Sequence, residues 1–340
     1  MARSDRRAHL GRHPDRFHGP RRLEDVGNGG PGGLEYRSRA GTRITYRARQ
    51  RGADATTWIH LALCLPAFLL SLAVVAGVSL LGEAWLGAPA WLPTTLWLVS
   101  GVLVFHRPTE SFLARHLLRL HRPLPHEQAL LGPLWHEVTT RAGVDGSRYD
   151  LWIEDSSDLN AFAAAGHLVG VTRHALDHLP DAQLAAVLAH ELGHHAGGHP
   201  WAGLLGQWYA LPGRTLWWGA VRLAPRLRRS PSSTTAWVLT AGVCWLAYTT
   251  LTASYGLPLL LLGLPWLTAA VGRRAELRAD AHAAGLGFAP VLIGLLEQSI
   301  AEEDSRSDRA RGTGRLPAVS WLLSHHPDHR TRLHHLQRYL

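Results

Sequence analysis

The stretch VLAHELGHHAGGH, residues 187–199, places four histidines around one acidic residue, Glu191. Apolar residues recur at helical spacing through it, which predicts a helix that starts at Pro180 and Asp181 and is ended by Gly197, Gly198 and Pro200. On a helix, His190 and His194 project from one face, and Glu191 lies about 100° around the axis. Two histidines that can share an ion, with a carboxylate beside them, form the pattern of a zinc hydrolase site.

The pattern has a simpler alternative, because the chain contains 22 histidines and some will fall at this spacing by chance. A catalytic zinc site also needs a third protein ligand. The metzincin class would supply a histidine at position 200, but that residue is proline, and His199 comes one position early. The metzincin class is therefore excluded.

A thermolysin-like site takes its third ligand from a glutamate on a later helix. The segment RRAELRADAHAAG, residues 273–285, offers Glu276, with Asp280 four residues on and on the same helical face. Asp280 could accept a hydrogen bond from the free ring N–H of a ligating histidine. The alternative is a solvated face on which both acids pair with the neighbouring arginines.

Composition limits the remaining chemistry. The formal charge of +9 is carried by arginine, since the chain has no lysine, and both cysteines, Cys64 and Cys244, lie in apolar runs. A disulfide framework and a cysteine-ligated zinc site are therefore excluded. A basic balance is compatible with nucleic acid or with an anionic membrane surface, and the long apolar runs favour the membrane.

The N-terminal half predicts a tail followed by a membrane hairpin. Residues 1–54 hold thirteen arginines and six acids with little apolar periodicity, which predicts a disordered cytoplasmic tail and no cleaved signal peptide. Residues 55–82 and 84–105 contain no charged side chain other than histidine, so we expect a transmembrane hairpin over residues 55–106. Arginines flank both outer ends, which places those ends in the cytoplasm.

A second hairpin is expected over residues 230–272, which contain no charge and no histidine. The preceding segment, residues 201–229, is either a span or an interfacial helix, and the arginines that follow it favour the surface position. These assignments predict about four spans. They also return Glu276 to the side of the membrane that carries His190.

The catalytic domain is predicted in two halves, residues 107–200 and 273–340. Short apolar or β-branched runs at 149–155 and 167–172 predict strands, and residues 273–286 and 289–303 predict helices. The fold class is therefore α+β, a predominantly helical integral membrane protein with a short β-sheet.

Four blocks in order resemble the HtpX-like membrane zinc endopeptidases, a family that also holds the CAAX prenyl endopeptidases. They are NAFAAAG (160–166) with HLVGVTRHAL (167–176), LAAVLAHELGHHAGGH (184–199), RRAELRADAHAAG (273–285) and HHPDHRTRL (325–333). Together they extend over residues 160–333. The resemblance implies a gluzincin-type catalytic domain that binds one zinc ion per chain.

The resemblance also implies roles for individual residues. His190, His194 and Glu276 would bind zinc, Glu191 would be the catalytic base, and His326 would donate to the tetrahedral intermediate, with His325 as its near neighbour. Asp280 would support a ligand, Arg332 would pair with an acid such as Asp280, and Asn160 and Ala161 would lie by an edge strand that aligns the substrate. An unpaired strand near 167–172 is expected to hold that substrate.

The expected function is that of a plasma-membrane zinc endopeptidase with its catalytic domain facing the cytoplasm, acting in membrane protein quality control. One alternative is a sensor peptidase with a single partner substrate. Another is a histidine-rich metal transporter or storage protein. The expected partners are a protein or peptide substrate and the lipid bilayer, without nucleic acid, and the oligomeric state is left open.

Overall fold

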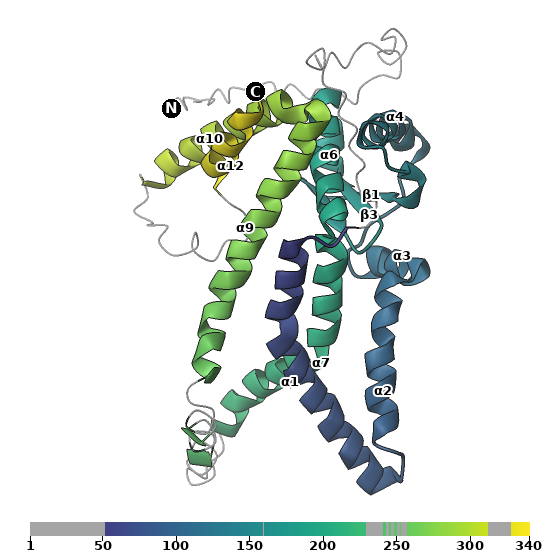
Figure 1. Cartoon of the computed structure of the whole chain (residues 1–340), viewed down its shortest axis with the longest axis vertical. Coiled ribbons are helices and arrows are strands. Elements are labelled where there is room, and N and C mark those ends of the chain that lie inside the picture. The colour runs from purple at the N-terminus through teal and green to yellow at the C-terminus, as the bar shows by residue number, and fades with distance from the viewer. Residues whose placement is uncertain are drawn as a thin grey trace, which may run out of the picture. The chain divides into compact units, whose positions relative to one another are not determined.

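The computed structural model describes residues 52–228 except 159, residues 257–311 and 328–340, and a few positions between 241 and 252 (Figure 1). Nearly all of the predicted tail over residues 1–54 lies outside these residues, as does much of the predicted hairpin over 230–272. His325 and His326 lie outside them as well.

The described chain is mostly helical, with one small sheet, as the sequence predicted. Its main elements are α1 (Ala55–Leu86), α2 (Trp91–Ser100), α3 (Arg107–His116), α4 (Pro125–Ala142), β1 (Asp150–Glu154), β2 (Ala161–Ala164), β3 (Leu168–Thr172), α5 (Arg173–His178), α6 (Asp181–Gly197), α7 (His199–Arg228), α9 (Leu264–Ala283), α10 (Ala289–Arg311) and α12 (His329–Leu336). A short 3₁₀ turn, Gly101–Phe105, connects α2 to α3.

The sheet has the strand order β1-β3-β2, with β1 parallel and β2 antiparallel to β3. The predicted strands at 149–155 and 167–172 are confirmed as β1 and β3. The prediction that the strand at 167–172 is unpaired is wrong, because β3 is bonded on both sides and β2 forms the edge. Gly170 permits this pairing, since a Cβ there would overlap the ring of Phe162 on β2.

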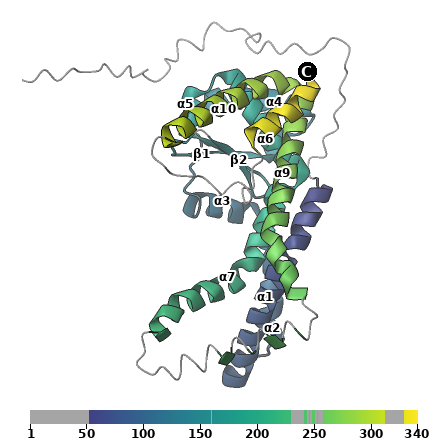
Figure 2. The same ribbon diagram turned by 90° about the vertical axis from the view of Figure 1, so that its left-hand side faces the viewer.

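Helices cover both faces of the sheet (Figure 2). On one face, Trp152 and Leu168 pack with Ala114 of α3 and with Leu120 in a single buried cluster. Neighbouring strand residues point to the opposite face, where α6 contacts β2 and β3. The sheet therefore holds α6, which carries the HELGH stretch, at a fixed height above α3.

Two helical stretches among the described residues are long and apolar enough to cross a bilayer, Ala55–Leu86 and Leu261–Ser305. They differ in burial, because only 6% of the most apolar window in α1 is buried, compared with 56% in the second stretch. The described residues leave most of this window of α1 unburied, so its apolar surface fits a lipid environment. Together with the short apolar helix Trp91–Phe105, these stretches suggest membrane association. The predicted count of four spans stays a prediction.

Helix α7 lies beside α1 over its first half. The backbone N–H of Asp54, just before α1, donates to the Gly197 carbonyl (3.2 Å), and the N–H of Gly213 donates to Ser71 Oγ (3.0 Å). Both helices therefore leave the sheet region in the same direction. Whether residues 201–229 lie on the membrane surface or cross it stays a prediction.

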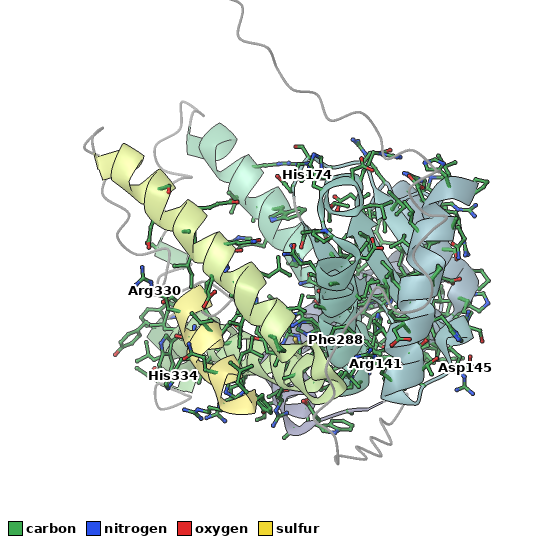
Figure 3. The ribbon with its side chains drawn as sticks, turned by 90° about the horizontal axis from the view of Figure 1, so that it is seen from above. Arg141, Asp145, His174, Phe288, Arg330 and His334 are labelled. Atoms are coloured by element: carbon green, nitrogen blue, oxygen red, sulfur yellow. The ribbon has the colours of Figure 1, made fainter. Side chains whose placement is uncertain are left out.

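The helix that carries Glu276 begins earlier than expected. Helix α9 runs unbroken from Leu264 to Ala283, so the predicted boundary at residue 272 falls inside it. A π-helical turn, Ala284–Phe288, then redirects the chain into α10, with Gly287 at φ 92°. Arg141 of α4 lies 5.2 Å from the centre of the Phe288 ring at this turn (Figure 3).

Candidate metal centre

Helices α6 and α9 bring three ligating side chains together. Nε2 of His190 and Nε2 of His194 lie 3.2 Å apart, and the Glu276 carboxylate approaches them at 3.4 and 3.5 Å respectively. His190 and Glu276 are buried, and His194 is partly buried. These three residues form the group of potential metal ligands found among the described residues.

The spacing of these atoms fits zinc. Ligand atoms about 2.0–2.1 Å from a tetrahedral zinc ion lie roughly 3.3–3.4 Å from one another. The two Nε2 atoms are 3.2 Å apart, Glu276 Oε2 is 3.4 Å from His190 and Oε1 is 3.5 Å from His194, and each of these distances is close to that edge length. Two imidazoles and one carboxylate are also a donor set that catalytic zinc uses, with a fourth position left for water or substrate.

Gly193 allows the two helices to approach this closely. A Cβ at residue 193 would lie 2.9 Å from the Cα and 3.1 Å from the carbonyl oxygen of Ala279. Backbone atoms cannot move aside as a flexible side chain can, so a larger residue would push α9 away from α6. The glycine inside the HELGH stretch therefore sets the distance from Glu276 to the histidines.

Asp280 lies directly behind His190. Its Oδ1 is 2.9 Å from Nδ1 of His190, the ring nitrogen that faces away from His194. Asp280 is fully buried, and Arg332 of α12 contacts it with two nitrogens, Nε at 2.8 Å and Nη2 at 2.6 Å. The paired charges hold the carboxylate in place, and the carboxylate in turn orients the imidazole.

The two histidines have opposite pKa shifts. Burial disfavours the charged form of His190, but contacts with the Asp280 and Glu276 carboxylates outweigh burial and raise its pKa. Burial lowers the pKa of His194, and the charge of His190 lowers it further. The neighbouring carboxylates therefore favour the protonated form of His190, whereas the surroundings of His194 favour its neutral form.

Glu191 is buried beside the ligands and has an unusual acidity. Burial raises the pKa of its carboxyl group to about 7, although the charge of His190 and a hydrogen bond from the Ala163 backbone oppose the shift. A carboxylate with a pKa near neutrality can both accept and release a proton at physiological pH.

The edge strand β2 presents its backbone to the same site. In an antiparallel pair, residues that bond to the partner strand alternate with residues whose backbone groups point away. Thr172 donates its N–H to the Asn160 carbonyl (3.0 Å), so Ala161 and Ala163 are the residues that face the open edge. Ala161 therefore lies where an extended chain could pair with β2, whereas the backbone groups of Asn160 are bonded to Thr172 at the start of that edge.

One cavity of about 550 Å³ joins these groups. Its polar wall contains His190, Glu191, His194, Glu276 and Arg332. Its apolar wall comes from α5, α6 and α10, through Ala175, Leu179, Val187, Leu292, Leu295 and Leu296. The cavity is thus polar at the ligands and apolar beyond them, with β2 along one side.

A further cluster of polar contacts was not predicted from the sequence, because Asp54 was assigned to the N-terminal tail. The Asp54 carboxylate caps α1 by accepting the N–H of Thr57 (2.9 Å) and pairs with Arg278 of α9. His199, at the start of α7, lies with Nε2 2.7 Å from Thr56 Oγ1. The start of α1 is therefore tied to α9 and to the end of α6. An Asp before the first apolar run is an N-cap signal that could have indicated part of this cluster.

His326 cannot be placed against this geometry, because it lies outside the described residues. His199 does not join the three ligands, and its Nε2 contacts Thr56 instead.

Comparison with known proteins adds an independent finding. A sequence model described as peptidase family M48 matches residues 125–340, more than half of the chain. A search of curated proteins finds no match. The matched region includes β1 to β3, α6, α9 and α12, the elements that build the His–His–Glu cluster and the residues behind it. The chain therefore belongs to peptidase family M48, the metallopeptidase family that contains HtpX and the CAAX protease homologues.

Proposed function

We propose that this protein is a membrane-bound zinc endopeptidase. The observation that carries the proposal is the cavity in which three ligand atoms at zinc spacing, a buried carboxylate with a pKa near 7 and an open strand edge meet. Membership of a metallopeptidase family supports the same chemistry.

His190, His194 and Glu276 would hold the zinc ion, one per chain. A bound zinc ion supplies a Lewis acid, which polarises the scissile carbonyl and acidifies a water molecule. Glu191 accepts a proton from the attacking water and delivers it to the leaving amine. His326 donates to the oxyanion as the tetrahedral intermediate forms, in line with the family resemblance.

The substrate binds as an extended chain against β2. Ala161 offers its backbone groups to the substrate and Ala163 offers its carbonyl, because the Ala163 N–H donates to Glu191; Asn160 lies at the start of that edge. Main-chain pairing selects weakly among side chains, whereas the apolar wall formed by α5, α6 and α10 accepts an apolar side chain. The preferred substrate is thus an unfolded or extended segment.

The chain crosses the plasma membrane several times, with the catalytic half in the cytoplasm. Arginines after α2 favour the cytoplasmic side, and α1 and α2 form the first pair of spans. We propose that the first half of α7 and the apolar half of α9 contribute to the second pair. The position of α7 along α1 supports this arrangement.

The biological role we propose is quality control of membrane proteins. An extended-chain site with little side-chain selectivity suits many misfolded substrates. Comparing membrane proteomes with and without the active enzyme tests this role. Many accumulating misfolded proteins would support quality control, and a single accumulating native protein would support a regulatory peptidase instead.

The central experiment replaces Glu191 with glutamine. Glu191→Gln should retain one equivalent of zinc by metal analysis and lose cleavage of casein by about 10²–10⁴-fold, since the base is removed and the ligands are not. The matched control is Glu297→Gln on α10, where the side chain is exposed. Undiminished cleavage by Glu191→Gln would refute the assignment of the base, and absence of zinc from the unsubstituted protein would refute the metal.

A further inference from the structure

Helix α3 carries an apolar and basic surface that no described element covers. Phe112 is 60% exposed, and Leu117 and Leu118, which follow the helix, are 71% and 42% exposed. Arg115 and Arg119 are exposed beside them. Exposed leucine and phenylalanine among arginines are typical of a helix that lies in a membrane interface.

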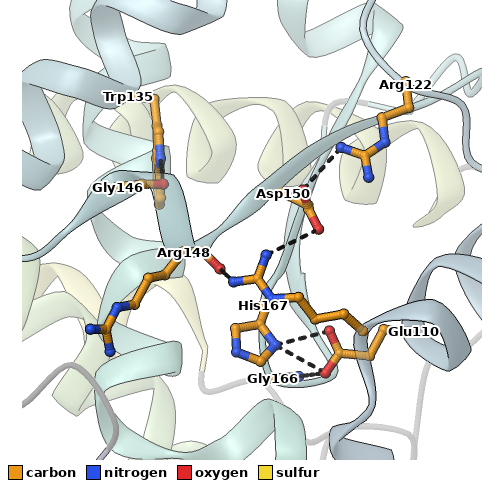
Figure 4. Close-up of polar contacts among 9 residues, drawn as sticks. Glu110, Arg122, Trp135, Gly146, Arg148, Asp150, Gly166 and His167 are labelled. Carbon is orange, nitrogen blue, oxygen red and sulfur yellow. Dashed lines mark hydrogen bonds and ion pairs between the residues drawn. The ribbon is translucent and has the colours of Figure 1, made fainter.

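The opposite face of α3 is fixed to the catalytic region. Buried Glu110 accepts a hydrogen bond from the Gly166 N–H (3.1 Å) and lies 3.0 Å from Nδ1 of His167, in the turn between β2 and β3 (Figure 4). Ala114 and Leu120 pack with Trp152 below the sheet. These contacts determine which face of α3 remains exposed.

The exposed face points to the side from which α2 extends. Both ribbon views place α3 between the sheet and α2 (Figures 1 and 2), and its buried face is the one against the sheet. The 3₁₀ turn between α2 and α3 is also apolar and exposed, with Val102 at 67% and Phe105 at 44%. The apolar surface of α2 therefore continues onto α3.

The charge of this surface is positive. Four arginines lie between residues 107 and 122, and the buried Glu110 is the one acid in that segment. Asp150 pairs with Arg122 at 2.9 Å and with Arg107 at 3.9 Å (Figure 4). Within the described part of the chain, Arg115 and Arg119 have no ion pair, although the Arg115 guanidinium stacks 5.8 Å from the Trp152 ring. Two cationic groups thus remain available to an anionic partner.

We propose that α3, with residues 117–122, docks on the anionic lipid surface of the cytoplasmic leaflet. Phe112 and the two leucines enter the boundary of the acyl chains, and Arg115 and Arg119 bind lipid phosphates. The proposal rests on the proposed membrane placement of α2. Because Glu110 ties α3 to the β2–β3 turn, this docking also sets the height of the substrate edge above the bilayer.

The test uses the full chain in vesicles, with Cys64 and Cys244 replaced by serine. A fluorophore is attached at one of three positions: His116→Cys beside Phe112, Leu70→Cys on α1, or His136→Cys on exposed α4. Quenching by brominated lipid and by aqueous iodide is measured in phosphatidylcholine vesicles and in vesicles containing phosphatidylglycerol. Lipid should quench the probe at 116, more strongly when phosphatidylglycerol is present.

The charge variant is Arg115→Gln with Arg119→Gln, and Arg338→Gln on the exposed C-terminus is its control. Each arginine at an anionic surface changes the docked-to-undocked ratio by about fivefold, so the double variant should lower that ratio by roughly 25-fold. The control should not change it. Zinc content of each variant shows that the fold is intact.

Three outcomes would overturn the proposal. If iodide reaches position 116 as readily as 136 while lipid quenches position 70, the chain is anchored but α3 is not docked. If position 116 is shielded from both quenchers, a protein surface covers α3. If lipid fails to quench position 70, the proposed membrane placement fails with it, although the cleavage assay on Glu191→Gln still tests the peptidase.

Discussion

Helices α1 and α6 are both rich in alanine and leucine, yet the chain uses them in opposite ways. In α1 the leucines face outward, as with Leu70 at 55% exposure, whereas Leu188 of α6 is fully buried. Helix α6 also places His190 and Glu191 in the interior, where each has a charged partner or a hydrogen bond. Apolar composition therefore marks a helix that avoids water, and the position of the polar residues shows whether protein or lipid surrounds it.

The largest predicted difference between α6 and α1 is the effect of enlarging a glycine in each helix. Gly193→Val should separate α9 from α6, abolish zinc binding and reduce cleavage by at least about 100-fold, because a displacement near 1 Å at a reacting group has that cost. Gly77→Val on α1 should leave both unchanged, since no atom lies within 4 Å of a Cβ there. Zinc analysis and casein cleavage measure both effects, and equal losses in the two variants would refute the difference.

Truncating one leucine in each helix should also change the free energy of unfolding by different amounts. Leu188→Ala should lower the free energy of unfolding by about 2–5 kcal/mol, because it leaves a cavity in a packed interior. Leu70→Ala removes a side chain that is more than half exposed and should cost less than about 1 kcal/mol. Thermal unfolding in one detergent provides the measurement. Similar shifts in Tm would mean that protein covers α1.

Two aspartates that pair with arginines of α12, one buried and one exposed, test whether burial determines how much such an ion pair contributes to zinc affinity. Asp280→Asn should weaken zinc affinity by about 10–100-fold, because Asp280 orients His190. Asp304→Asn is the control, since Asp304 pairs with Arg330 at 3.0 Å but both side chains are largely exposed. Competition with a chelator of known affinity measures both. An unchanged affinity in Asp280→Asn would exclude the orienting role.

The smallest predicted effect is the release of protons when metal binds. His190 has a raised pKa in the metal-free site and must lose its proton to bind a cation, so about one proton should leave per zinc at pH 7. Glu191, with a pKa of about 7, should release a further fraction. Zinc affinity should therefore fall as pH falls. Calorimetry in buffers of different ionisation enthalpy counts the protons, and a count of zero would contradict the proton assigned to His190.

The local parts of the site could be predicted from sequence, because helical spacing alone places His190 and His194 on one face and Glu276 above Asp280. The close contact between α6 and α9 could not be predicted, since it depends on Gly193 meeting Ala279, a residue far along the chain. The spacing of residues in the sequence predicts which of them share a helix face, but it does not predict which face of another helix they contact.

The sheet order and the position of α7 show the same limit. The segment Ala161–Ala164 contains three alanines and no β-branched residue, so its strand propensity is weak, and tertiary pairing with β3 makes it the edge. The packing of α7 along α1, through the Gly213 N–H and Ser71 Oγ, likewise joins residues that are distant in sequence. Neither contact could be predicted from a local signal.

Under the proposed membrane placement and zinc site, the unbroken helix from Leu264 to Ala283 would connect the metal ligand Glu276 to the lipid. Glu276 lies twelve residues along this rod from Leu264, a lever of about 18 Å. A tilt of about 5°, within the range by which bilayer thickness reorients helices, would shift its carboxylate by roughly 1.6 Å. Zinc coordination tolerates about 0.2 Å. A thinner or thicker bilayer would therefore change how well the third ligand reaches its ion.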